Sequence, residues 1–314
     1  MHCLFSSISC KQVILVWSVI IRLALARVAG FLLAASPAML QSGVPSPHES
    51  PSHDLLLQAA VEASQAAGAL LLHYAATGFQ IEYKNPINLV TDADRAAEQC
   101  VIDHLKTRFP DHHFLAEERG RDDAGFSPYR WIIDPLDGTT NFAHGYPTYC
   151  VSIGLEYERR CIIGVVFDPS RNELFTAIEH RGAQVNGRPI HVSDTKTLDS
   201  SLLVTGFAYD IRETTRNNLD HFAKFALKAQ GIRRTGSAAL DLCYVAAGRF
   251  DGFWEVRLSP WDMAAGSVIA REAGGRLTDF SGKDLSIYGQ ELVASNGQIH
   301  EAMLAVLNHA SPQR

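Results

Sequence analysis

The sequence predicts a mixed α+β fold in which helices pack on the faces of β-sheets, and three observations support this class. Two amphipathic helical patterns come first, at residues 54–75 and 94–108. A series of strand-like runs with short connections follows, which favours an antiparallel meander. In the second half, strand-like and helical patterns alternate, as they do where helices cover sheet faces.

Each element of the first half rests on a local pattern. The helix at 54–75 presents one apolar face, made by Leu56, Ala59, Ala60, Ala63, Ala67, Leu70, Leu71 and Tyr74. The helix at 94–108 ends before Pro110, which cannot continue it. Strands are predicted at residues 130–133, 149–157, 161–167 and 173–178. Short links such as Glu158-Arg-Arg160 indicate that consecutive strands pair with each other.

The second half is predicted to begin with a strand at 202–205 and to end with a helix reaching about residue 308. Between them we expect helices at 218–229, 237–247 and 261–273, and strands at 231–235, 250–256 and 291–294. Gly274 supplies a stop signal for the helix at 261–273. The sequence contains no internal repeat that we can detect.

Composition limits the class of protein. The 314 residues are 46% hydrophobic and 20% charged, enough apolar sequence for a substantial core. The net charge of −6, from 34 acidic and 28 basic residues, offers no basic footprint for nucleic acid. The six cysteines form no Cys-x-x-Cys pair and are expected to be reduced thiols, as in a cytoplasmic protein.

Residues 1–51 differ from the rest of the chain. They contain apolar runs at 13–21 and 28–35, three basic residues, and no acid before Glu49. A signal peptide or membrane anchor is one interpretation, which would make the protein exported or membrane-anchored. The other is that translation begins at Met39. The Ser- and Pro-rich stretch at 41–51 is typical of a linker before a domain at 52–314.

The residues that indicate chemistry follow the apolar run at 130–133. Asp134 and Asp137 are three positions apart across Pro135, an arrangement suited to pointing both carboxylates at one cation. The next residues are Gly138, Thr139 and Thr140, which can offer backbone and hydroxyl groups to a phosphate.

Asp-Pro and Asp-Gly are also ordinary turn dipeptides. Asp168-Pro169 and Asp251-Gly252 occur alone in this chain and are interpreted as turns. Two further acidic segments favour more than a turn for the first pair. Glu117-Glu118 follows a short strand-like run, and Asp262 begins the helix at 261–273. Adjacent acids at a strand end are a common way to bind a hard cation.

Together these segments resemble the inositol monophosphatase family of Mg²⁺-dependent, Li⁺-sensitive phosphatases. The resemblance runs from about Ser52 to near the C-terminus. Its motifs are Asn88-Leu-Val-Thr-Asp-Ala-Asp94, Glu117-Glu118, Asp134 to Phe142, Gly236-Ser-Ala238, Trp261-Asp262 and Glu272-Ala-Gly-Gly275. The resemblance implies a layered α-β-α-β-α sandwich of the inositol monophosphatase and fructose-1,6-bisphosphatase type. Its halves would span about 52–195 and 196–314, with the site at their seam.

The resemblance also implies two Mg²⁺ ions in each site, with a third, weaker ion as an option. Glu117, Asp134 and the backbone carbonyl of Leu136 would hold the first ion, and Asp134, Asp137 and Asp262 the second. All-oxygen ligation is what Mg²⁺ prefers. A haloacid-dehalogenase-type nucleophile is disfavoured, because there the two aspartates are two apart rather than three.

By the same resemblance, Glu117 and the Thr139 hydroxyl hold the attacking water, and Asp94 accepts a hydrogen bond from the threonine. Lys84 is a further accessory candidate. The expected substrate contacts are Gly138, Thr139, Thr140, Gly236, Ser237, Ala238, Glu255 and Asp262. Several of these have a purely local explanation. Asp94, Ser237 and Asp262 suit helix N-terminal caps, and Lys84 suits a solvated surface.

The function expected first is hydrolysis of inositol 1-phosphate by metal-activated water. One alternative is a sugar phosphatase with fructose-1,6-bisphosphatase or dual specificity, for which residues 207–215 provide a candidate substrate-shaping loop. Another is a regulatory protein that acts through its surface. A small phosphorylated polyol and a second copy of the chain, as a homodimer, are the expected partners.

Overall fold

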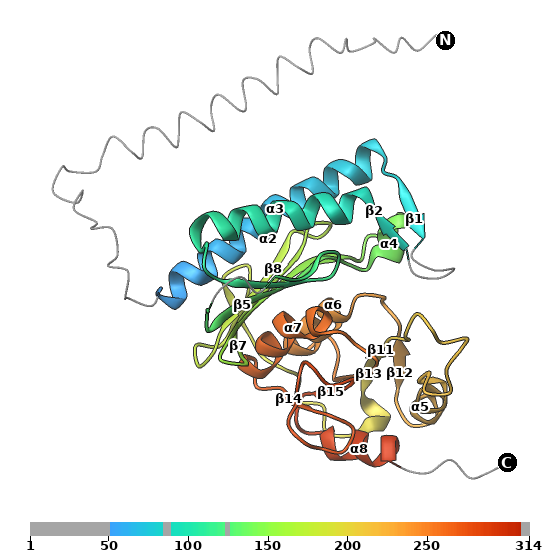
Figure 1. The fold of residues 1–314 in the computed structure, drawn as a ribbon. Coiled ribbons are helices and arrows are strands. Elements are labelled where there is room, and N and C mark those ends of the chain that lie inside the picture. Colours follow the sequence, from blue (N-terminus) through green and yellow to red (C-terminus); the bar gives the residue numbers. More distant parts are fainter. Residues whose placement is uncertain (1–50, 84–88, 123–125, 309–314) are drawn as a thin grey trace, which may run out of the picture. The chain divides into compact units, whose positions relative to one another are not determined.

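Two large β-sheets and three helical layers alternate through the region that the computed structural model describes, residues 51–83, 89–122 and 126–308 (Figure 1). A third sheet has only two strands, residues 81–83 and 89–91, which pair antiparallel. The helices are α2 (His53–Thr77), α3 (Asp92–Arg108), α4 (Thr139–Ala143), α5 (Leu219–Ala226), α6 (Ala238–Ala246), α7 (Pro260–Glu272) and α8 (His300–Asn308), with a 3₁₀ turn at Leu198–Ser200. The strands of the first half are β1 (Ile81–Tyr83), β2 (Leu89–Thr91), β3 (His113–Ala116), β4 (Gly120–Asp122), β5 (Tyr129–Asp137), β6 (Cys150–Tyr157), β7 (Arg160–Asp168), β8 (Glu173–Ile178), β9 (Ala183–Val185) and β10 (Arg188–Ile190). Those of the second half are β11 (Leu202–Thr205), β12 (Gly231–Arg233), β13 (Gly252–Val256), β14 (Arg276–Thr278) and β15 (Glu291–Ser295).

The larger sheet has eight strands in the order β10-β9-β8-β7-β6-β5-β3-β4. The expected meander is confirmed, since β5, β6, β7 and β8 pair antiparallel in succession. Only β3 and β5 pair in parallel within this sheet, and this brings the end of β3 beside the end of β5. The smaller sheet has the order β12-β11-β13-β15-β14 and is parallel through its first three strands.

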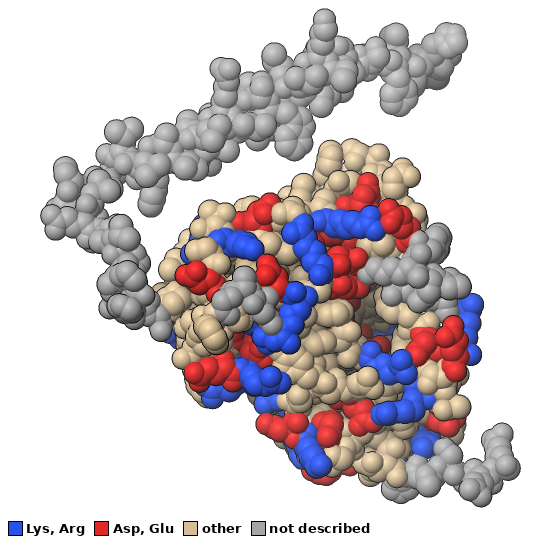
Figure 2. All heavy atoms as spheres, in the orientation of Figure 1, with Lys and Arg blue, Asp and Glu red and all other residues tan. Residues whose placement is uncertain are grey.

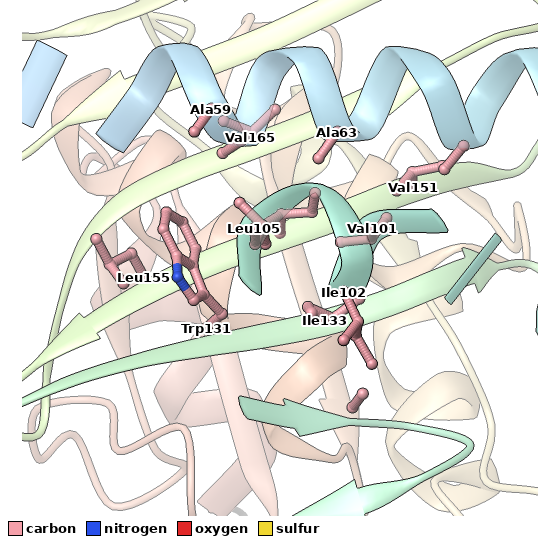
Figure 3. Close-up of a cluster of buried hydrophobic side chains, with 14 of the residues drawn as sticks. Ala59, Ala63, Val101, Ile102, Leu105, Trp131, Ile133, Val151, Leu155 and Val165 are labelled. Carbon is pink, nitrogen blue, oxygen red and sulfur yellow. The ribbon is translucent and has the colours of Figure 1, made fainter. Parts of the chain in front are cut away.

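Helices α2 and α3 cover one face of the larger sheet, and α6 and α7 lie between the two sheets (Figure 1). Successive side chains of a strand point to opposite faces of the sheet, so neighbouring residues of β5 belong to different cores. Trp131 and Ile133 of β5 pack in the core under α2 and α3, whereas Ile132 packs in the core beneath α6 and α7. Figure 3 shows the first of these cores, with Ala59 and Ala63 of α2 facing the sheet. Helices α5 and α8 complete the layered α+β sandwich that was predicted.

Two glycines let α7 approach the larger sheet closely. A Cβ on Gly164 of β7 would lie 2.3 Å from the carbonyl oxygen of Ala265, and one on Gly154 of β6 would lie 2.7 Å from the Ala264 Cβ. Any side chain at these positions would push the helix away. The glycines therefore fix where α7, and Asp262 in its first turn, stands relative to β5.

Every helix and strand predicted above is present, and β5 continues beyond the predicted 130–133 to Asp137. The sequence did not predict the short elements β1, β2, β4, β9, β10, β14 and α4, or the 3₁₀ turn at Leu198–Ser200. The expectations for residues 1–50, and for Lys84, fall outside the described residues and stay predictions.

Helix α2 is long and apolar enough to cross a membrane, but its face with Leu56, Ala63 and Leu71 is buried in the core.

Acidic and basic side chains are interspersed on the face drawn in Figure 2. No large patch of one sign is visible there, which agrees with the mild net charge of −6. This face gives no support for nucleic-acid binding.

Candidate active site

The acidic motif lies where β5 ends and the chain turns into α4. Asp134 and Asp137 are buried, and the pairing of β5 with β6 shifts register between them. In a regular strand, residues three apart point to opposite faces, so the irregularity re-aims one of the two carboxylates. Gly138 then takes φ +98°, and a Cβ there would lie 2.9 Å from the carbonyl oxygen of Thr148. Only glycine fits this turn.

Glu117 reaches the same place from β3. The parallel ladder pairs Ala116 with Ile133, and the backbone N–H of Glu117 donates to the Ile133 carbonyl at 3.2 Å. The next step along the ladder therefore sets Glu117 beside Asp134. The turn is held from behind by Glu98 of α3, whose Oε2 accepts from the backbone N–H of Glu118 at 2.8 Å.

Asp137 is held by the N-terminus of α6. Its Oδ2 accepts from the Ser237 hydroxyl and from the backbone N–H of Ala239, both at 2.7 Å. Ser237 is also the N-cap of α6 and accepts from the backbone N–H of Leu240. The helix dipole and these donors favour negative charge on Asp137. The predicted helix cap is thus confirmed, and the same side chain binds Asp137, while substrate contact by Ser237 stays a prediction.

Asp262 occupies the third position of α7. Its Oδ2 accepts from the backbone N–H of Ser259 at 2.7 Å, which completes a capping box in front of Pro260. The cap is therefore Ser259, and Asp262 is its reciprocal partner. This leaves the other carboxylate oxygen of Asp262 for a ligand.

Thr139 is buried at the start of α4, and its hydroxyl lies 3.1 Å from Asp94 Oδ1 and 3.0 Å from the Leu136 carbonyl oxygen. Asp94 Oδ2 meanwhile accepts from the Thr91 hydroxyl at 2.6 Å and its N–H at 2.8 Å, forming the capping box of α3. The predicted contact between Asp94 and Thr139 is present alongside the cap. Burial raises the pKa of Asp94 to about 6.

The four acids at the strand and helix ends repel one another. Burial raises the pKa of Asp134 well above its ordinary value, and the charges of Glu117, Asp137 and Asp262 raise it further. The pKa of Asp137 is raised by burial, and that of Asp262 by burial and by the charge of Asp137. Among the described side chains, no group of three His, Cys, Asp or Glu residues is arranged so that it could hold one metal ion in this structure.

The chemistry of this donor set nevertheless fits a hard divalent cation. All the donors are oxygens, and the repulsion that raises their pKa values is what a 2+ charge would reverse. Asp134 uses only Oδ1 internally, accepting from the backbone N–H of Leu136 at 3.0 Å. The Leu136 carbonyl, predicted as a ligand, faces the Thr139 hydroxyl.

A pocket of about 120 Å³ opens beside these acids. It is lined by seven of the predicted site residues, Asp137, Thr140, Gly236, Ser237, Ala238, Glu255 and Asp262. Gly138, Thr139, Leu136, Asp134, Asp94 and Glu117 do not line it and lie behind or beside it. Asn141 ties its walls together, since its amide donates to the carbonyls of Thr148 at 2.7 Å and Thr235 at 2.8 Å.

The sequence did not single out three pocket residues, Arg234, Asp241 and Arg257. Asp241 and Glu255 are both buried, and burial raises the pKa of each well above its ordinary value, while Arg234 opposes that shift. Arg234 and Asp241 flank the Gly236 motif closely in sequence, which was a usable signal. Nothing in the sequence marks Arg257.

Comparison with known proteins agrees with this geometry. Residues 52–311 match the family described as the inositol monophosphatase family. An inositol-1-monophosphatase from Synechocystis is 49% identical over 258 residues, 82% of this chain and 90% of that protein. A protein from Escherichia coli named Nus factor SuhB is 42% identical over 252 residues, 80% of this chain and 94% of its own length.

Solved structures give the same result. The inositol monophosphatase from Anabaena (Nostoc) superposes with a TM-score of 0.76 at 46% identity, covering 82% of this chain and 97% of that one. An inositol monophosphatase/NADP phosphatase, solved with NADP and Ca²⁺, superposes with a TM-score of 0.74 at 25% identity, covering 84% and 98%.

Proposed function

The chain belongs to the inositol monophosphatase family and is a phosphoric monoester hydrolase, and we propose that its substrate is the monoester of a small polyol, inositol 1-phosphate first. We further propose that the required ion is Mg²⁺. The observation that supports this most is the set of buried and half-buried oxygen donors, Glu117, Asp134, Asp137 and Asp262, whose neighbouring charges raise the pKa of Asp134 and of Asp262 beside a polar pocket.

These residues, with the Leu136 carbonyl, would hold the ions. When bound, the ions supply Lewis acidity toward the phosphoryl group and make a bound water more acidic. The chain's own contribution is positioning. Because the Thr139 hydroxyl donates its one proton to Asp94 or to the Leu136 carbonyl, its oxygen would act as an acceptor for an incoming water.

The pocket would then bind the two parts of the substrate separately. Thr140 offers a donor to the phosphoryl oxygens, and the dipole of α6, whose first backbone N–H groups already bind Asp137 and Ser237, favours the negative charge. Glu255 and Asp241 offer carboxyl groups to the hydroxyls of a polyol, which carries many O–H donors. A hydroxyl-rich leaving group therefore suits this pocket better than an apolar one.

The direct test is release of phosphate from inositol 1-phosphate at millimolar Mg²⁺. Asp134→Asn should abolish release, whereas Asp194→Asn, at an exposed acid outside the pocket, should leave it unchanged. No release by the wild-type protein, or full activity of Asp134→Asn, would contradict the proposal. Fructose 1,6-bisphosphate assayed in parallel tests the sugar-phosphatase alternative.

A second role through the protein surface is a separate proposal. It is supported by the 42% identity to the relative named Nus factor SuhB. Partner capture by the Asp134→Asn protein would separate such a role from catalysis, because the substitution leaves the surface intact. A homodimer, inhibition by Li⁺ and a cytoplasmic location are proposed from the family resemblance alone.

A further inference from the structure

One wall of the pocket is formed by the segment that leaves β11, where Gly206, Phe207, Ala208 and Tyr209 line the cavity. The Tyr209 side chain is 46% exposed, although it belongs to this wall. Burial raises the pKa of Tyr209 above its ordinary range, and the charges of Glu117, Asp137, Asp262 and Asp134 add to this. Tyr209 therefore lines the same cavity as Asp137 and Asp262, with about half of its side chain open to solvent.

The segment from Gly206 to Asn218 contacts β13, the strand that carries Glu255, at both of its ends. A Cβ on Gly206 would lie 2.3 Å from the Glu255 carboxylate oxygens, so any side chain there would displace that carboxylate. At the other end, Asn218 donates from its amide to the Gly206 carbonyl at 2.8 Å and accepts from the Trp254 indole N–H at 2.8 Å. The wall is thus built on β13.

A third attachment lies next to Tyr209 itself. Asp210 pairs with Arg257 at 2.7 Å between Oδ2 and Nη2, and both side chains are partly exposed. Arg257 follows β13 with φ +64°, a left-handed conformation that is unfavourable for a residue with a Cβ. The Asp210–Arg257 pair links the residue that follows Tyr209 to the residue that follows β13.

We infer that Tyr209 is a specificity-determining residue, whose open ring packs on the carbon face of a cyclic polyol while Glu255 and Asp241 bind the hydroxyl edge. A half-exposed aromatic ring beside polar groups suits a ligand with one apolar face and a polar rim. The Asp210–Arg257 pair holds that ring in place. This inference rests on the proposed phosphatase function and selects cyclic over acyclic esters within it.

The test compares kcat/KM for inositol 1-phosphate with that for glycerol 2-phosphate, an acyclic ester cleaved by the same chemistry. Tyr209→Ala should lower the value for inositol 1-phosphate by about 10-fold or more, mainly through KM, and leave glycerol 2-phosphate within about 3-fold. Tyr209→Phe keeps the ring and should retain most of the preference. Phe126→Ala removes an exposed ring outside the pocket and should change neither value.

Two variants test the attachment. Arg257→Gly removes the guanidinium and also relieves the left-handed backbone, and Asp210→Asn removes only the charge. Both variants should lower the ratio of kcat/KM for inositol 1-phosphate to that for glycerol 2-phosphate, as Tyr209→Ala does, but by a smaller factor. The melting temperature of each variant shows whether it is folded. If Tyr209→Ala lowers kcat/KM equally for both esters, or leaves the ratio of the two values unchanged, the proposed role of Tyr209 is wrong. The proposed phosphatase function would still stand in that case, because it depends on the activity of the wild-type protein. No phosphate release from either ester by the wild type overturns both.

Discussion

Asp94 offers the sharpest prediction, because its two carboxylate oxygens serve two different partners. Oδ2 accepts from the backbone N–H and hydroxyl of Thr91 and caps α3, while Oδ1 accepts from the Thr139 hydroxyl at 3.1 Å. Asp94→Asn keeps one acceptor and replaces the other with an amide donor. The acceptor should stay with Thr91, because an amide there would face the Thr91 N–H donor.

The magnitudes follow from this arrangement. With the cap retained, Asp94→Asn should change the free energy of unfolding by less than about 1 kcal/mol. Asp94→Ala keeps the Thr91 cap but loses the reciprocal half of the capping box, and it should cost about 1 kcal/mol, or about 2–4 °C in melting temperature for a domain of this size. In Asp94→Asn the amide donates to the Thr139 oxygen and occupies its lone pair. We therefore expect kcat to fall about 10–100-fold, as for other groups that orient a reacting residue.

The assay is the pH profile of kcat alongside thermal melting. Burial raises the pKa of Asp94 to about 6, so protonation below that pH removes the acceptor for Thr139. Wild-type kcat should fall as pH decreases through about 6. In Asp94→Asn, kcat should not show this fall near pH 6, because the side chain no longer titrates. Full kcat in Asp94→Asn, or a large loss of stability with kcat unchanged, would refute the assignment.

Three further predictions concern stability and metal affinity. Burial raises the pKa of Asp94 to about 6 and that of Asp134 well above 3.8, so their contribution to folding is present below the unfolded pKa of 3.8 and is lost as pH rises, past about 6 for Asp94. Millimolar Mg²⁺ should therefore raise the melting temperature more at about pH 7.5 than at about pH 5.5, and an equal gain would contradict this. Glu98→Ala removes the acceptor for the Glu118 N–H and should raise the Mg²⁺ concentration for half-maximal activity about 10-fold, whereas Glu98→Gln, which keeps an acceptor, should not. Gly164→Ala, whose Cβ would lie 2.3 Å from the Ala265 carbonyl oxygen, should cost about 1–3 kcal/mol in chemical denaturation. Gly182→Ala, at φ +79° in open space, should cost about 1 kcal/mol, and the reverse order would contradict the packing argument.

The long elements could be predicted because their periodicity is local. Helix α2 repeats its apolar residues over 25 positions, and β6 to β8 are separated by short links. The three-residue strands β9 and β10 carry too few residues to show a period, and they form because neighbouring strands supply partners. The extension of β5 to Asp137 was missed for a related reason, since Pro135 is a poor strand residue and its place depends on the irregular pairing with β6.

The acids of the site could be predicted because they lie in short motifs. The pocket wall could be foreseen only as a region, residues 207–215, because its form depends on contacts between distant segments. Asp210 pairs with Arg257, and Asn218 bonds to Trp254, contacts that no local pattern encodes. Specificity is therefore harder to infer from this sequence than catalysis.

Three residues were open to two interpretations, a helix cap or a member of the site, and the structure shows why these are compatible. A carboxylate has two oxygens, and Asp94 and Asp262 each use Oδ2 for a capping box. Asp94 Oδ1 then accepts from Thr139, while Ser237 caps α6 with its lone pair and donates its proton to Asp137. A helix start is a rigid, positively polarised platform that stabilises an acid and fixes its direction. Capping at a buried helix start is therefore a way to aim a reactive carboxylate, and a capping motif alone is no argument against a role in catalysis.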